Sequence, residues 1–155
     1  VRCVGKHVLR RWRLRRRSRP IPQRKDPMIL SLDPGHWTGW ALVGTEGELV
    51  RVFAVGQFRY EELPNHLSAL QLLSQAFRVR EWVVEDIPDM QPDEVTSEVI
   101  GYLLGAAIDL GVRVERVKPF HWKYLKSQIQ VPDLIHSKDA AGMGMVWLSR
   151  LNTSY

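Results

Sequence analysis

The sequence predicts an α/β fold: a five-stranded mixed sheet, three antiparallel strands followed by two parallel ones, with helices on both faces. Three apolar runs joined by short turns open the globular part, which is typical of an antiparallel meander. Two further apolar runs each follow a stretch with helical spacing, and parallel strands need such a crossover. The length of 155 residues, without an internal repeat, is that of one domain.

The domain is expected over residues 28–155, after a basic arm over 1–27. The arm holds 11 of the 22 Lys and Arg against one acid, Asp26, a net charge of +10, whereas the remainder holds 16 acids and carries −5. Its run Arg10–Arg17 is typical of a disordered segment that attracts polyanions. An Arg-rich, acid-poor start is also found in organelle transit segments, and translation starting at Met28 would make the arm an upstream extension.

The bulk composition narrows the class of protein. A hydrophobic content of 45% and a charged content of 25% are ordinary for a soluble globular domain. Cys3 is the only cysteine, which excludes an internal disulfide and a cysteine-based zinc site. No run approaches the ~18 apolar residues of a membrane span, so no membrane partner is expected.

The first predicted strand, Met28–Asp33, is apolar and ends on a carboxylate. Pro34 and Gly35 then turn the chain. A second strand opens at Gly39 and continues over Trp40–Val43, and a third covers Leu49–Val55. An acid at the end of a buried strand is held rigidly, which suits a metal ligand or a catalytic base. The alternative is that Asp33 only caps the turn.

The rest of the chain alternates between helical and extended patterns. Gly142 and Gly144 are expected to weaken the last helix by roughly 1 kcal/mol each. The predicted elements are a helix over 61–78 with Pro64 in its first turn, a strand over 82–84 followed by two acids, a helix over 93–110, a strand over 112–117, a short helix over 119–126 and a last helix over 133–151. The tryptophans at positions 37, 40, 82, 122 and 147 are expected in the core or in an interface rather than as base-stacking platforms.

Acidic residues lie at the ends of elements that the fold would bring together. Asp33 and Glu85 follow the first and fourth strands, and the carboxyl ends of parallel neighbours share one edge of a sheet. Asp139 lies near the start of the last helix, with His136 three residues before it on the same helical face. Such acids repel unless cations lie between them, and oxygen-rich clusters suit Mg²⁺ or Mn²⁺. Asp86 is the alternative to Glu85, because the strand register decides which side chain faces the site.

These motifs together resemble those of RuvC-type Holliday junction resolvases, which belong to the ribonuclease H-like superfamily. The segment Leu32-Asp-Pro-Gly…Thr38-Gly-Trp40 resembles the opening Asp-Pro-Gly…Thr-Gly-Tyr motif of that family. Val84-Glu85 resembles its second acidic motif, and His136-Ser-Lys-Asp139 its terminal His-x-x-Asp motif. The resemblance covers about residues 28–152.

The resemblance implies a ribonuclease H-like fold and a nuclease that resolves branched DNA, above all four-way junctions. Asp33, Glu85 and Asp139 would bind two Mg²⁺ ions, or Mn²⁺ in their place, with His136 as the fourth group. Two such ions about 3.5–4 Å apart activate water and stabilise the leaving oxygen in phosphodiester hydrolysis.

The resemblance also implies a lysine in the active site and a symmetric dimer. Lys123 is the first choice for binding the scissile phosphate, ahead of Lys118 and Lys126. The helix over 93–110 would form the homodimer interface, where Gly101 and Gly105 allow close approach. A two-fold dimer presents two identical sites, which matches the paired nicks that a four-way junction needs.

The chain also departs from the family pattern. Its turn after Asp33-Pro-Gly is one residue shorter, its last helix reads Gly142-Met-Gly-Met145, and residues 86–92 lack the aromatic wedge of bacterial members. These differences suit a short viral relative in the cytoplasm of a bacterial or phage-infected cell. Two other functions stay open: a broader nuclease for flaps, forks or RNA–DNA hybrids, and a non-catalytic nucleic-acid binder that uses the arm.

Overall fold

The computed structural model describes residues 27–86, 93–118 and 135–152. The arm and the short helix expected over 119–126 lie outside the described residues. Within them, no helix is long and apolar enough to cross a membrane. The elements are β1 (Met28–Asp33), β2 (Trp37–Glu46), β3 (Leu49–Arg59), the 3₁₀ turn η1 (Tyr60–Glu62), α2 (Leu63–Ala76), β4 (Glu81–Glu85), α3 (Glu94–Leu110), β5 (Arg113–Val117) and α4 (Ile135–Asn152).

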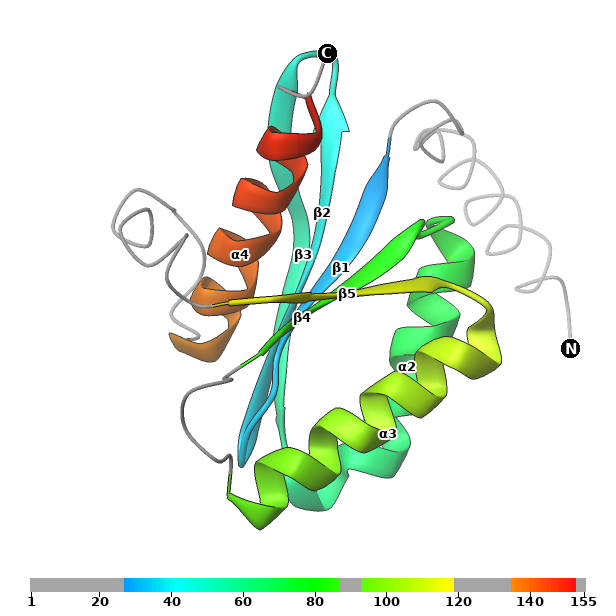
Figure 1. Ribbon diagram of the computed structural model, residues 1–155. Coiled ribbons are helices and arrows are strands. Elements are labelled where there is room, and N and C mark those ends of the chain that lie inside the picture. Colours follow the sequence, from blue (N-terminus) through cyan, green and yellow to red (C-terminus); the bar gives the residue numbers. More distant parts are fainter. Residues whose placement is uncertain (1–26, 87–92, 119–134, 153–155) are drawn as a thin grey trace, which may run out of the picture.

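The strands form one mixed sheet in the order β3-β2-β1-β4-β5. The pairs β1–β2 and β2–β3 are antiparallel, whereas β1–β4 and β4–β5 are parallel. The predicted fold class is therefore confirmed. Because β3 runs antiparallel to β2, it points the same way as β1, and β1, β3, β4 and β5 all end at one edge of the sheet (Figure 1).

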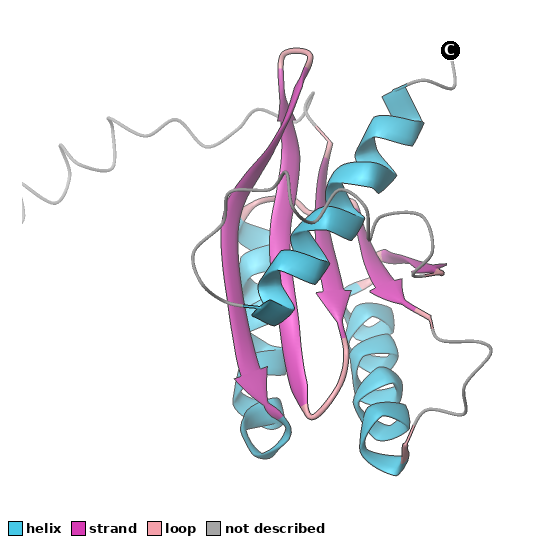
Figure 2. Cartoon of the chain, turned by 90° about the vertical axis from the view of Figure 1, so that its left-hand side faces the viewer, coloured by secondary structure: helices cyan, strands magenta, loops and turns pink. Residues whose placement is uncertain are grey.

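Helices cover both faces of the sheet, with α4 on one face and α2 and α3 on the other (Figure 2). Successive side chains of a strand point to opposite faces, so each strand contributes to two cores. The core under α2 and α3 is made by residues that include Leu30, Leu32, Trp82, Val84, Val99 and Leu103. The core under α4 is made by Ile29, Ala41, Val43, Val83, Val117, Ala140, Ala141, Met143 and Leu148.

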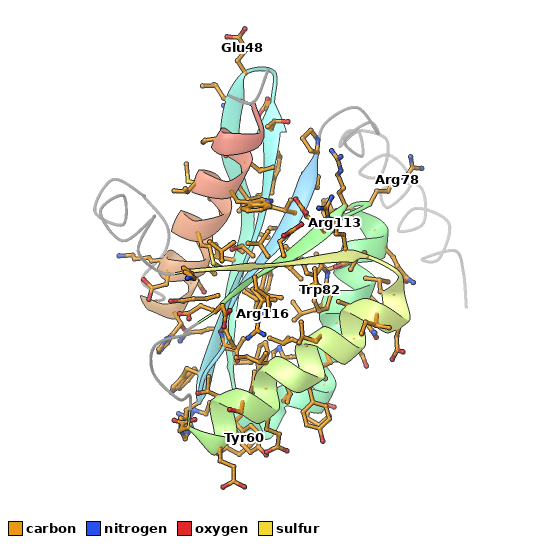
Figure 3. The ribbon with its side chains drawn as sticks, viewed as in Figure 1. Glu48, Tyr60, Arg78, Trp82, Arg113 and Arg116 are labelled. Atoms are coloured by element: carbon orange, nitrogen blue, oxygen red, sulfur yellow. The ribbon has the colours of Figure 1, made fainter. Side chains whose placement is uncertain are left out.

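Trp82 anchors the core beneath α2 and α3 (Figure 3). It is fully buried, and its indole N–H donates a hydrogen bond of 2.9 Å to Ser74 Oγ. The Ser74 hydroxyl in turn donates to the carbonyl oxygen of Leu70 over 2.8 Å. The polar atom of the largest core residue thus has a partner, as buried polar groups require.

The β2–β3 hairpin is longer than its sequence pattern predicts. Strand β2 begins at Trp37 rather than Gly39, and β3 continues to Arg59 rather than ending at Val55. Gly56 lies opposite Trp40 in the register, and a β-carbon at Gly56 would run into the Trp40 indole. Gly56, which by its residue type indicates the end of a strand, therefore lies inside β3 and makes room for the large Trp40 side chain on the neighbouring strand.

The helices agree with their predicted positions, with small differences at their ends. The pattern over 61–78 divides into η1 and α2, which stops at Ala76 before Arg78 takes a positive φ of 51°. In α4, a β-carbon on Gly144 would press on Val43 and Ser31. Gly144 therefore permits the close approach of α4 to the sheet. Helix propensity alone counts this glycine only as destabilising, because it does not include such packing.

Candidate active site

Asp33 and Glu85 occupy equivalent positions on neighbouring strands. β1 and β4 are parallel, and Leu32 lies opposite Val84 in their register. The next residue of each strand is the acid. Asp33 alternates with Ile29 on the α4 face, and Glu85 shares that face with Val83, so both carboxylates belong to the side of the sheet that α4 covers.

Glu85 and Asp86 face opposite sides of the sheet. The Glu85 side chain lies on the α4 face and is only 6% exposed. Asp86 accepts a hydrogen bond of 2.8 Å from the Arg116 guanidinium, and Arg116 lies opposite Val84, whose side chain packs under α2 and α3. Glu85, and not Asp86, shares a face with Asp33.

The first turn of α4 packs directly on the sheet beside β1. Gly39 is opposite Asp33 in the β1–β2 register, and a β-carbon on Gly39 would overlap the backbone carbonyl of His136. The Ser137 hydroxyl donates a hydrogen bond to the carbonyl oxygen of Gly56 on β3. These contacts place the start of α4, which carries the half-buried Asp139, over the edge where Asp33 lies.

His136 contacts an aromatic side chain of β2. Its imidazole stacks on the Trp37 indole, with ring centroids 6.3 Å apart and an interplanar angle of 3°. Trp37 is 36% exposed, so of the core and interface positions expected for the tryptophans it does not occupy the core, whereas Trp82 is fully buried and Trp40 and Trp147 pack against the two cores. The Arg59 guanidinium lies over the same indole, with its central carbon 4.7 Å from the ring centroid.

The predicted ligands share a face and an edge but do not form a closed cluster. Among the described residues, no three His, Cys, Asp or Glu side chains are grouped so that they could hold a metal ion. Lys123 and Lys126 lie outside the described residues, as do residues 87–92 of the segment that lacks the aromatic wedge. Lys118, the other candidate lysine, follows β5 and is exposed.

A further contact ties the turn after Asp33 to the start of α3. His36 Nε2 lies 2.9 Å from Asp93 Oδ2, and both side chains are exposed. Asp93 is also the N-cap of α3, where its Oδ1 accepts from the Thr96 backbone N–H over 2.7 Å. These hydrogen bonds, that from Thr96 first, lower the pKa of the Asp93 carboxyl from its ordinary value.

Comparison with known proteins gives a fold but no sequence family. No family model and no curated protein matches the sequence. Among solved structures, Thermus thermophilus RuvC superposes with a TM-score of 0.68 at 18% identity, over 81% of this chain and 97% of that one. The same protein in complex with a Holliday junction substrate gives 0.66 at 18% identity, over 82% and 97%. The fowlpox virus Holliday junction resolvase gives 0.54 at 14% identity, over 81% and 99%.

The chain has the RuvC fold. The mixed ribonuclease H-like sheet that the sequence predicts is therefore shared with a RuvC structure from a bacterium and a resolvase structure from a virus. Those structures are matched over nearly their whole length.

Within this RuvC-type fold, the sequence pattern missed the row formed by Arg59, Trp37 and His136. Arg59 lies four residues beyond the predicted end of the third strand, so the sequence pattern does not predict its pairing with Trp37. Only the full hairpin register, with β2 starting at Trp37, would have placed the two side chains opposite each other.

Proposed function

We propose that the chain is a divalent-metal-dependent endonuclease that cuts branched DNA, with Holliday junctions as its substrate. The observation that carries the proposal is the buried carboxylate of Glu85, which has no basic partner within the described part of the chain. Buried charges are normally paired or bound to a metal. Glu85 and Asp33 each follow the registered pair Val84 and Leu32, in a fold shared with structures named as RuvC and as a Holliday junction resolvase.

The donor set fits a hard divalent cation. Asp33, Glu85 and Asp139 offer carboxylate oxygens, which Mg²⁺ and Mn²⁺ prefer, and His136 offers a fourth group from the same turn of α4 as Asp139. Two Mg²⁺ ions bound there would supply an activated water and neutralise the leaving oxygen. Binding them would also relieve the repulsion between carboxylates that end neighbouring strands.

The residues of the site then have different roles in binding the metal ions and the substrate. The carboxylates of Asp33 and Glu85 come from the rigid sheet, so they fix the position of the site, while Asp139 closes it from α4. Lys123 follows β5 in sequence and is proposed to bind the scissile phosphate and its developing charge.

A homodimer through α3 completes the proposal, because a four-way junction needs two symmetric cuts. Tyr102 and Ile108 on this helix are 52% and 73% exposed. Gly101 and Gly105 lie on the same exposed side, and a β-carbon at either would meet no other atom within 4 Å. This face combines exposed apolar side chains with small residues, which favours close packing against a second copy.

The test is a cleavage comparison with the full chain in Mg²⁺ on a four-way junction, a flap, an RNA–DNA hybrid and a linear duplex. The proposal predicts fastest cutting of the junction, and no cutting by Asp33→Asn although it still binds. Faster cutting of the flap or of the hybrid would show that the Holliday junction is not the preferred substrate and would indicate the broader nuclease instead. Binding without any metal-dependent cutting, lost on deletion of residues 1–27, would instead indicate a non-catalytic binder.

A further inference from the structure

The carboxyl-end edge of the sheet carries one arginine with an unusual set of contacts. Arg59 is the last residue of β3 and is exposed. It forms no ion pair with any acid in the described part of the chain, whereas Arg51, Arg113 and Arg116 each pair with a carboxylate. Its contact is instead the face of the Trp37 indole, 4.7 Å from the guanidinium carbon.

The geometry places Arg59 on the same side of the sheet as the acids. Arg59 lies opposite Trp37, and side chains directly opposite in an antiparallel pair point to the same face. Trp37 also stacks on His136 at the start of α4, so this is the α4 face. β3 and β1 end at the same edge (Figure 1) and are two strands apart, a separation of about 10 Å.

A guanidinium stacked on an aromatic ring is oriented but not neutralised. The cation–π contact engages its flat face and leaves the N–H groups at its edge to bind a planar or tetrahedral anion. The site beside it is acidic, and the domain from residue 28 onward carries a net charge of −5. A DNA strand that enters such a site needs fixed cations along its path.

We propose that Arg59 binds a backbone phosphate of the DNA strand that enters the acidic site, and that Trp37 is the positioning residue that holds its guanidinium. The inference rests on the proposed nuclease function and adds a specific phosphate contact to it. The bound group is one phosphate, so the contact contributes affinity without sequence preference. Because Trp37 also stacks on His136, the same indole positions both the Arg59 guanidinium, which contacts the DNA strand, and the His136 imidazole from α4.

The experiment measures equilibrium binding of a four-way junction, with Ca²⁺ in place of Mg²⁺, over a range of salt concentrations. Arg59→Gln is expected to weaken binding roughly tenfold, as for one charged hydrogen-bonding contact, and to lower the salt slope by about one. Arg51→Gln is the matched control, on the same strand but ion-paired with Glu46 over 2.6 Å, and should leave both quantities unchanged.

Trp37 is tested through its effect on Arg59. Trp37→Leu should weaken binding in the wild-type background but add little to Arg59→Gln, because both changes remove one contact. Trp37→Phe keeps an aromatic face and should restore most of the affinity. A merely structural role would lower the melting temperature of Trp37→Leu without changing the salt slope.

The outcomes separate this inference from the proposed function. If wild type binds and cuts junctions while Arg59→Gln binds as Arg51→Gln does, the phosphate contact is wrong and the nuclease assignment stands. If wild type binds junctions with the predicted Arg59 dependence but never cuts in Mg²⁺, the nuclease assignment fails alone. A wild-type protein that binds no junction overturns both.

Discussion

Asp33 and Glu85 each stand one residue beyond a registered pair, Leu32 and Val84, of two neighbouring parallel strands, on the face that α4 covers. Side chains carried by strands are held more precisely than those on loops, and register decides which face of the sheet they point to. The two acids are separated by more than 50 residues in sequence, so their proximity is a property of the fold rather than of a local motif.

The contact between Gly39 and the start of α4 predicts a large effect of a small substitution. Gly39→Ala would force its methyl group into the His136 carbonyl, so we expect a loss of about 2–3 kcal/mol in the free energy of unfolding and impaired cleavage. Gly101→Ala is the control, made in an Ile108→Glu background that removes the proposed dimer contact, because within one chain it meets open space in a helix and should stabilise by about 0.5–1 kcal/mol. Urea denaturation measures both, and equal effects would contradict the packing described.

The hydrogen bond between Trp82 and Ser74 predicts a change in stability without a change in chemistry. Ser74→Ala leaves the buried indole N–H without an acceptor, which costs about 1–3 kcal/mol. Cleavage per folded molecule should stay unchanged, since Ser74 belongs to α2, which packs on the face of the sheet opposite the acids. Chemical denaturation with an active-site titration checks this, and a selective loss of cleavage would show that the two faces are coupled.

The lowered pKa of Asp93 predicts how stability depends on acidity. In the folded chain this carboxyl gives up its proton at a lower pH than in the unfolded chain. Its stabilisation is therefore complete above the unfolded pKa of about 4 and is lost as the pH falls through the lower folded value. The difference in melting temperature between wild type and Asp93→Ala should thus be constant near neutral pH and shrink below about pH 4. A difference that grows on acidification would contradict the assignment.

The exposed face of α3 predicts a variant that separates dimer assembly from folding. Ile108→Glu places a charge where the proposed homodimer would bury it, so we expect monomers by sedimentation, with a melting temperature that no longer rises with protein concentration. Leu72→Glu is the control, as a similarly exposed apolar residue on α2, 66% exposed. Wild type that sediments as a monomer at all concentrations would rule out this interface.

The apolar pattern predicted the fold class, the order of the elements and the antiparallel and parallel pairings, because alternation and helical spacing reflect burial directly. It placed Asp33 and Glu85 at strand ends, which the structure confirms. It could not give the full β2–β3 hairpin, because Gly39 and Gly56 are residues typical of turns. Their place inside strands depends on close packing partners that the local sequence does not reveal. The row from Arg59 through Trp37 to His136 depends on that register and on the docking of α4, neither of which local sequence encodes.

The most direct test of the central claim compares two buried glutamates of β4 that share one face. Glu85 ends the strand beside Asp33, whereas Glu81 begins it and accepts a hydrogen bond of 2.6 Å from the Trp147 indole N–H. In a single-turnover junction-cleavage assay with Mg²⁺, Glu85→Gln should lose at least a hundredfold in rate, about 2.7 kcal/mol of the activation barrier, while Glu81→Gln, which can still accept that hydrogen bond, should cut at close to the wild-type rate. Cleavage by Glu85→Gln at the wild-type rate would contradict the account.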